Sequence, residues 1–514
     1  MKMHRNKAWA GMTVLAIALG LNGCGGDEDT SSTASQIVVN TPAQIAQESA
    51  DSYDDNVNGL ISAATLKRWK DNWPTERAKL GLTGKLIILQ VTAGPTGAEY
   101  IKPDGVNVFT YCQDAILCSV QAGSWTQTRT NGVIESVSMV PDGAQMDANL
   151  KKYNIDPRND MIVAAMGTGS NPNAMSQGRI WYALRYWGVD KKNLAILNGA
   201  NAWTPAGGVL TYPADFTAAD FQATPTTAPN SGTVSVKSLA VDNTRLQATL
   251  DDMLRILPSG DTNVKNDGVF IWDARSLGQY SAGEMVEFGE DTDSDTASNQ
   301  ACGSASYFPG AAYCTPANPN NYMWTFQNGG SRQGHPWGTL QLQYTHMLDA
   351  TRGYAYRPKA ELASMLAGGT NALGAGFVGA DYQLVGSGNA YQAGDTIYAY
   401  CETTFRAMIT GVASAVILGK PTRFYDGAMV EWNSMSHLMD KNGDYILPSN
   451  SPWRTDVRSF YRPATSYTLV NARTITDPYA AHANAVVNAD RAYKTGEAAS
   501  SGGGGGAPSN PCGG

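Results

Sequence analysis

Histidine groups, basic clusters and metal-type cysteine spacings are missing from this 514-residue sequence, and each absence excludes a class of function. The five histidines form no H-E-x-x-H or comparable group, and there is no C-x-x-C-H motif, which argues against a zinc hydrolase and a c-type cytochrome. The net charge is −8 and no basic cluster occurs, so we expect no nucleic-acid partner. Two acidic stretches, 291–295 and 440–444, lack the full ligand set of a calcium loop. We therefore predict no metal and no cofactor.

Long apolar runs are also missing, apart from one at the N-terminus. Basic residues precede an apolar run over 8–21, which is shorter than the ~20 residues needed to span a bilayer. The run ends in Leu21-Asn-Gly-Cys24, which resembles the cleavage site of bacterial lipoproteins. This resemblance implies a signal peptide over 1–23 and a lipid on Cys24. Because no aspartate follows that cysteine, it also implies an outer-membrane lipoprotein, on the periplasmic or surface face, with a tether over 24–57.

Cysteine is infrequent, and most of the seven cysteines have an expected role. Four of them form two close pairs, and in an exported protein such pairs predict local disulfides: Cys112 with Cys118, and Cys302 with Cys314. Metal ligation is the alternative, which the lack of C-x-x-C spacing and of a following histidine disfavours. Cys512 remains without a predicted partner.

The remaining cysteine, Cys401, stands in the most informative stretch of the chain. It ends an apolar run over 397–400, and apolar residues then recur at helical spacing from Phe405 to Val416, with Gly419 as a stop signal. The pattern predicts a strand, a short loop and a helix, with the sulfur near the helix N-terminus. Free backbone amides and the helix dipole favour an anion there, and Arg406 adds a positive charge, so we expect a nucleophilic thiolate.

Segments on both sides of Cys401 carry a specific resemblance. Downstream come Asp426-Gly427 and Glu431-Trp432; upstream come Asp273-Ala-Arg275-Ser276 and the turn Phe308-Pro-Gly-Ala311. In this order the segments resemble those of rhodanese-type sulfurtransferases, and context gives motif matches their weight. The other interpretation is a buried structural cysteine that happens to precede a helix.

The chain also repeats its own pattern, which predicts two related domains. Apolar strands at 86–91 and 162–166, followed by a helix over 178–188 and a strand at 194–197, parallel the Cys401 region. Alternating strands and helices predict an α/β fold, and the resemblance implies two tandem rhodanese-like domains, each a mainly parallel five-stranded sheet flanked by helices. The predicted bounds are a first domain over 58–210, a linker over 211–236, a second domain over 237–465, and a C-terminal extension with a glycine-rich tail over 466–514. The first domain is expected to be inactive because its loop after Met166 has no cysteine, and Gln90 stands where the second domain has Asp273.

The resemblance implies a reaction in which a Cys401 persulfide carries a sulfane sulfur from a donor to a thiophilic acceptor. It assigns the cradle of that sulfur to the loop residues Glu402, Thr403, Thr404, Phe405 and Arg406, and support of the loop to Asp273 and Arg275. Lys237 lies near a linker position where relatives carry a substrate-binding cation. An alternative is a rhodanese-fold lipoprotein that binds or scaffolds an envelope complex, for electron transfer or oxyanion handling, with little catalysis. Donor, acceptor and protein partners are not determined by the sequence.

The lipid prediction can be tested directly. Since the apolar run is too short to span a bilayer, membrane retention should depend on Cys24. We expect Cys24→Ser to move the protein from the salt-washed membrane pellet to the soluble fraction, measured by immunoblot. A Cys512→Ser control should stay in the pellet, and a Cys24→Ser protein that remains there would contradict the assignment.

Overall fold

The computed structural model describes residues 37–113, 125–131, 135–213, 215–280, 334–436 and 484–496, which all belong to one compact unit. Cys24, Cys118, Cys302 and Cys314 lie outside these residues, as does the turn at 308–311. The predicted lipid, the disulfides and that turn therefore stay predictions.

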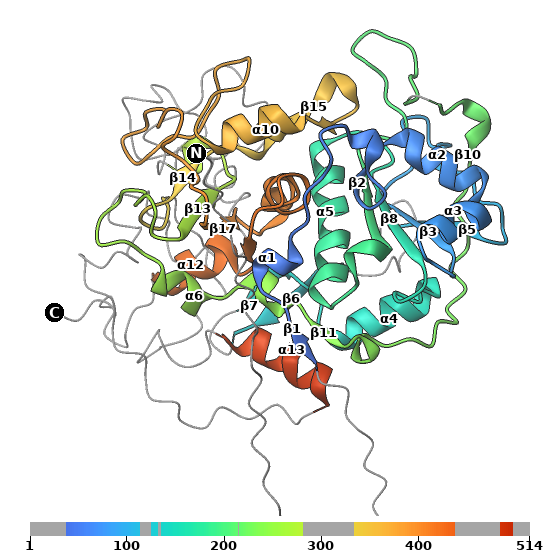
Figure 1. Cartoon of the computed structure of the whole chain (residues 1–514), viewed down its shortest axis with the longest axis horizontal. Coiled ribbons are helices and arrows are strands. Elements are labelled where there is room, and N and C mark those ends of the chain that lie inside the picture. The colour runs from blue at the N-terminus through green and yellow to red at the C-terminus, as the bar shows by residue number, and fades with distance from the viewer. Residues whose placement is uncertain are drawn as a thin grey trace, which may run out of the picture. The chain divides into compact units, whose positions relative to one another are not determined.

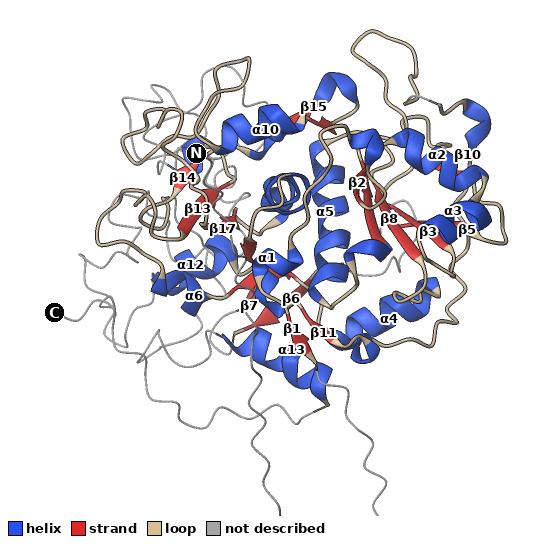
Figure 2. Ribbon diagram, in the orientation of Figure 1, coloured by secondary structure: helices blue, strands red, loops and turns tan. Residues whose placement is uncertain are grey.

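Two five-stranded parallel sheets form the framework, and they share one strand order. The first runs β2 (Gly59–Ile61), β9 (Leu194–Leu197), β8 (Met161–Ala165), β3 (Leu86–Gln90), β5 (Val108–Cys112). The second runs β12 (Gln247–Ala248), β18 (Thr422–Tyr425), β17 (Thr396–Tyr400), β13 (Val269–Asp273), β14 (Leu340–Gln341). Figure 2 shows them as two separate groups of strands. The predicted α/β fold with two tandem parallel sheets is confirmed.

Composition explains why these segments are central strands. β3 (LIILQ) and β8 (MIVAA) are buried at every residue, as expected when helices cover both faces of a parallel sheet. The first half contributes α2 (Ala63–Asp71), α3 (Trp73–Lys79), α4 (Gly143–Tyr153) and α5 (Asn171–Tyr186). The second contributes α6 (Leu250–Arg255), α7 (Leu277–Tyr280), α10 (Lys359–Leu366), α11 (Phe405–Gly411) and α12 (Ala428–Ser436). Across the described ranges, no helix has the length and apolarity to cross a bilayer.

The two halves meet at α5 and α11, which lie side by side between the sheets (Figure 1). Gly178 makes the close approach possible, because a Cβ built there would stand 2.6 Å from Cβ of Met408. Phe424 of β18 adds an aromatic contact across the same boundary, with its ring centroid 4.9 Å from that of Tyr182. The halves therefore share one buried core, which joins residues of α5, α11 and both sheets.

The predicted tether over 24–57 is wrong for residues 37–57. β1 (Val38–Val39) pairs in parallel with β11 (Val241–Asp242). The segment then packs on the second half, where the Gln47 amide donates to the Ala415 carbonyl at 2.9 Å. Paired backbone groups hold this stretch in place, although its composition is that of a polar linker.

The described parts of the predicted linker and of the C-terminal extension both contact the first half. Within 211–236, β10 (Phe221–Gln222) pairs with β4 (Tyr100–Ile101). In the extension, α13 (Ala485–Thr495) contacts α4 and β6 (Gln127–Thr130), as Figure 1 shows. A buried ion pair ties α13 down, with Arg129 Nη1 2.7 Å from Asp490 Oδ2. The C-terminal helix is thus part of the packed unit.

Candidate functional site

Cys401 is the first residue after β17, the central strand of the second sheet. Tyr400 pairs with Asp273 at the end of β13, so the turns after these two strands lie next to each other at the carboxyl edge of the sheet. Ligands of parallel α/β sheets bind at this edge. The Cys401 side chain is 0% exposed, and it is the free cysteine of the described residues.

Three successive carbonyls of the loop after β17 accept hydrogen bonds from outside the loop. They are Cys401 from Met429 N (3.1 Å), Glu402 from Val430 N (3.2 Å) and Thr403 from Arg179 Nη2 (3.0 Å). No cis peptide bond occurs in the described chain, and in a trans peptide the carbonyl and the following N–H point in opposite directions. The amides of Glu402, Thr403 and Thr404 are therefore directed away from those partners, as a cradle for an anion requires.

The loop ends in a strained residue. Thr404 has φ 61° and ψ 7°, a left-handed conformation that is uncommon for a β-branched side chain. Its hydroxyl donates to the Tyr425 carbonyl at 2.9 Å, and the side chain is fully buried. α11 begins at the next residue, Phe405. Strain of this kind persists only where the surroundings hold it, and it is concentrated at functional sites.

Asp273 and Arg275 form a fully buried pair beside the loop. Arg275 Nη2 lies 2.7 Å from Asp273 Oδ2, and the Tyr400 hydroxyl donates to the same oxygen at 3.0 Å. Burial and the charge of Asp273 raise the pKa of Tyr400, so the phenol stays a donor. Arg275 Nη1 also reaches Glu402 Oε2 at 3.4 Å. The Glu402 carboxylate is thus held beside a cation, which offsets part of the negative charge that the sequence places next to Cys401.

Arg406 is directed toward the turn after β13. Its Nη1 donates to Gln279 Oε1 at 2.6 Å, and both side chains are buried. Gln279 is a site residue that the sequence reasoning missed, although it follows the Asp273-Ala-Arg275-Ser276 segment closely. The structure therefore brings Cys401, the loop residues, Asp273, Arg275 and Arg406 together at one edge of the sheet.

Lys237 and Cys112 lie away from the Cys401 loop. Lys237 is exposed, and its Nζ stands 4.2 Å from the ring centroid of Tyr493 on α13. Its described contact is with that helix, so its role toward a substrate stays a prediction. Cys112 ends β5 in the first half, and its predicted partner Cys118 lies outside the described residues. Nowhere in the described ranges do three metal-ligating side chains gather.

Arg179 is the most consequential residue that the sequence reasoning missed, because a helix of the first half carries it into the Cys401 loop. The residue is 1% exposed, and its Nη1 lies 2.7 Å from Oδ1 of the fully buried Asp426. Arg179 Nη2 donates to the Thr403 carbonyl of the loop. The guanidinium carbon also lies 5.2 Å from the centroid of the Phe405 ring. The helix pattern around 178–188 predicted only a core, and no sequence signal links Arg179 to a loop more than two hundred residues away.

A second contact from the first half reaches Glu431 of α12. Asn131, which follows β6, donates through Nδ2 to Glu431 Oε1 at 2.8 Å. Burial raises the pKa of Glu431 to about 7, and the nearby Asp426 charge acts in the same direction. In the Glu431-Trp432 segment seen in the sequence, the Glu431 carboxyl is therefore a buried group that can be protonated, and it lies at the boundary between the halves.

Comparisons with known proteins give distant likenesses. No family model matches the sequence, and no curated protein matches it. Among solved structures, the chain is similar to Tum1 from Saccharomyces cerevisiae at 15% identity and a TM-score of 0.37, covering 73% of this chain and 95% of that one. It is also similar to the anaerobic ergothioneine biosynthesis enzyme from Chlorobium limicola at 13% identity and a TM-score of 0.39, covering 76% and 70%. A third is 3-mercaptopyruvate sulfurtransferase from Leishmania major, at 12% identity and a TM-score of 0.33, covering 73% and 74%. Likeness at this level carries no argument about chemistry.

The Arg179 contacts predict that the first half holds the loop closed. We expect Arg179→Met to speed alkylation of Cys401 by about tenfold or more, because the loop loses a charge-assisted hydrogen bond worth roughly 1.5–3 kcal/mol. The rate is measured by mass spectrometry of the Cys401 peptide. Arg185→Met is the matched control, since Arg185 is buried on the same helix but donates to Val189 and Ile45. Equal acceleration in both variants would show general loosening instead.

The raised pKa of Glu431 predicts a pH dependence of stability. Between its ordinary value of 4.5 and about 7, the unfolded carboxyl is ionised while the folded one stays protonated. The unfolded state then binds fewer protons, so the free energy of unfolding falls as pH rises through this window. Glu431→Gln should remove roughly 3 kcal/mol of that fall, measured by urea denaturation at several pH values. The exposed Glu48→Gln control should keep it, and an unchanged slope in Glu431→Gln would show that the carboxyl ionises freely when folded.

Proposed function

We propose that the protein is a rhodanese-like sulfurtransferase in which Cys401 carries a sulfane sulfur as a persulfide. The observation that supports this most strongly is the loop after β17, which begins with Cys401, the only free cysteine of the described chain. The carbonyls of Cys401, Glu402 and Thr403 accept hydrogen bonds from groups outside the loop. Such a loop presents amides to a sulfur anion at the carboxyl edge of a parallel sheet. Two described segments that resemble the rhodanese family lie at the same place. Asp273 pairs with Arg275, which reaches Glu402, and Asp426 pairs with Arg179, which donates to the Thr403 carbonyl.

The proposed reaction has two displacement steps. The Cys401 thiolate attacks the transferable sulfur of the donor. The bond that holds this sulfur breaks, which is S–S in thiosulfate or an organic persulfide and C–S in 3-mercaptopyruvate. Its electron pair leaves with the rest of the donor, as sulfite, a thiolate or the pyruvate enolate, and a Cys401 persulfide forms. A thiophilic acceptor then attacks the outer sulfur of that persulfide, takes it, and returns the Cys401 thiolate. The inward amides of Glu402, Thr403 and Thr404 would stabilise the sulfur anion in both states, as preorganised donors do. Arg406 would add positive charge from the start of α11.

Arg275 and Asp273 would keep the loop in place for this chemistry. Arg275 connects the end of β13 to the loop by two ion pairs, one from Nη2 to Asp273 and one from Nη1 to Glu402. Neither residue needs to touch the donor for this role. Lys237 lies against Tyr493 of α13, so it would bind a donor only if that donor extended to this helix.

Complete burial of Cys401 supports a second candidate function. A donor can reach a fully buried sulfur only after part of the site moves. If the site stays closed, the protein would act as a binding or scaffold component of an envelope complex, in electron transfer or oxyanion handling. In either case we propose an outer-membrane lipoprotein, with a lipid on Cys24 and disulfides Cys112–Cys118 and Cys302–Cys314.

Detection of the persulfide separates the two functions. After incubation with thiosulfate, 3-mercaptopyruvate or an organic persulfide, intact and peptide mass spectrometry should find one added sulfur on Cys401. Cyanide should then release it as thiocyanate. Cys401→Ser should lose both signals and Cys512→Ser should keep them. Wild-type protein without added sulfur from any of these donors would favour the scaffold function.

The Glu402 carboxylate predicts donor selectivity. We expect Glu402→Gln to speed persulfide formation from the dianion thiosulfate more than from a neutral organic persulfide, because it removes a negative charge beside the nucleophile. Arg275 already offsets part of that charge, so we expect a difference of about tenfold or less. Glu361→Gln, on α10, is the control. Equal effects on charged and neutral donors would show that the carboxylate faces away from the donor.

A further inference from the structure

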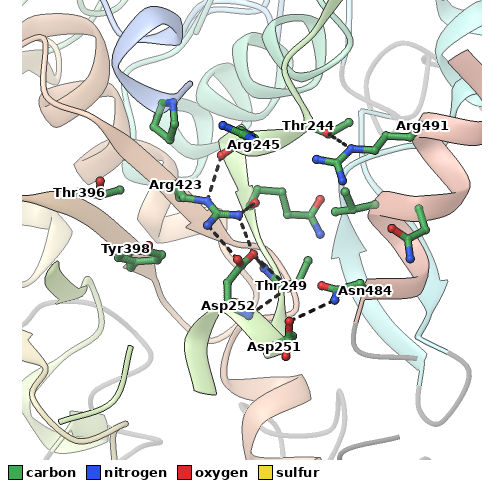
Figure 3. Close-up of a pocket in the computed structure, with 14 residues that line it drawn as sticks. Thr244, Arg245, Thr249, Asp251, Asp252, Thr396, Tyr398, Arg423, Asn484 and Arg491 are labelled. Carbon is green, nitrogen blue, oxygen red and sulfur yellow. Dashed lines mark hydrogen bonds and ion pairs between the residues drawn. The ribbon is translucent and has the colours of Figure 1, made fainter. Parts of the chain in front are cut away.

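A polar cavity of about 520 Å³ opens at the other end of the second sheet (Figure 3). Its lining includes Gln247 and Thr396, the first residues of β12 and β17, and Arg423 near the start of β18. Cys401 follows the opposite end of β17, roughly 16 Å away along a strand of five residues. The N-terminal segment at Pro42 and helix α13 complete the walls. This cavity is therefore separate from the Cys401 site.

One arginine of the cavity is fully used by the protein. Arg423 makes a bidentate pair with Asp252, through Nη1 at 3.0 Å and Nη2 at 2.6 Å, and also donates to the carbonyls of Arg245 and Gln247. Asp252 neutralises the charge of Arg423, and the hydrogen-bond donors of its guanidinium already have protein partners. Arg423 and Asp252 thus form a rigid wall, not a ligand contact.

Two other arginines keep donors available. Arg245 is exposed, and no ion pair in the described part of the chain involves it. Arg491 donates through Nε to Thr244 at 2.9 Å and lies 3.4 Å from Asp242, but no hydrogen bond among the described residues engages its Nη groups. Its side chain is 42% exposed. This side of the cavity therefore offers guanidinium groups to an anion.

Gln247 adds a buried acceptor between the walls. The residue is 2% exposed, and its Oε1 has no hydrogen-bond partner in the described chain. A buried polar atom without a partner is costly, so a donor that reached this oxygen would be stabilised. An inorganic anion such as sulfate has no such donor to give.

The two carboxylates that line the cavity, Asp251 and Asp252, lie apart from Arg245 and Arg491. In Figure 3, Arg245 and Arg491 occupy the upper side of the cavity, and Asp251 and Asp252 the lower side. Asp251 accepts from Arg255 Nε at 2.9 Å and from Asn484 Nδ2 at 3.3 Å, which leaves lone pairs on the carboxylate for a further donor. The cavity therefore presents opposite charges at its two sides.

We propose that this cavity binds a small zwitterion of the α-amino-acid class. The ligand carboxylate would lie against Arg245 and Arg491, where guanidinium groups suit carboxylate geometry. Its ammonium group would donate to Gln247 Oε1 and to Asp251. A volume of about 520 Å³ is in the range of small-molecule sites and admits a ligand of this size. The site does not depend on sulfur transfer at Cys401.

Calorimetric titration of the purified full chain tests the proposal, with the standard L-amino acids as probes, one at a time. We expect at least one to bind. Its deaminated acid and its decarboxylated amine should each bind at least tenfold more weakly. Binding of none of the amino acids at millimolar concentration would overturn the proposal, and so would sulfate binding as tightly as the best amino acid, because that would indicate a plain anion site.

Substitutions locate the binding in the cavity. Arg245→Gln changes an exposed side chain, so it should leave the unfolding midpoint unchanged while weakening amino-acid binding at least tenfold. Arg491→Gln should weaken binding as much, and its midpoint also reports the lost contacts with Thr244 and Asp242. Gln247→Leu should weaken binding too, and should raise the midpoint of the ligand-free protein if the buried acceptor is unmatched there. Arg158→Gln, an exposed arginine of the first half that pairs with Asp156, is the matched control and should bind as wild type. Unaltered affinity in both arginine variants would place any observed binding elsewhere and overturn the assignment.

Discussion

The buried ion pair between Arg179 and Asp426 connects the halves of this protein at the place where the cysteine loop is built. Both partners are almost without solvent exposure, and they lie 2.7 Å apart. A buried pair of this kind adds little net stability, but loss of one partner leaves an unmatched charge that costs about 3–5 kcal/mol. Its effect is therefore mainly one of placement. Since the same guanidinium also donates to the Thr403 carbonyl, the first half determines where the loop of the second half lies.

Equal strand order in the two sheets makes the difference between the halves easy to see. Gln90 and Asp273 both end the strand next to the central one, and the next residues after the central strands are Met166 and Cys401. Gln90 is turned into its own half, where Nε2 donates to the carbonyls of Thr92 and Glu99. Asp273 instead anchors a cation that reaches the loop. The first half therefore has Gln90 and Met166 at the positions where the second half has Asp273 and Cys401.

Charges around Cys401 form a chain of partners. Tyr400 and Arg275 hold Asp273, and Arg275 in turn reaches Glu402. On the other side Arg406 is matched to the neutral Gln279. In a site with this little solvent exposure, each charge is screened mainly by its partner. The electrostatic potential at Cys401 therefore depends on these pairings more than on the residue types of the loop.

The sequence by itself determined the parallel sheets, the strand–loop–helix unit at Cys401, and the contrast between Gln90 and Asp273. Apolar runs, glycine stops and short motifs are local, and they act within a few residues of each other. The tertiary structure decided what joins distant segments: Arg179 at Thr403, Asn131 at Glu431, α13 on the first half, and the packing of residues 37–57. A buried arginine in an apolar helix has the same local pattern whether its partners are carbonyls, as for Arg185 with Val189 and Ile45, or include a carboxylate 247 residues away, as for Arg179. Only the fold determines which partner is within reach, because the cost of burying the charge is met by contact in space and not by position in the chain.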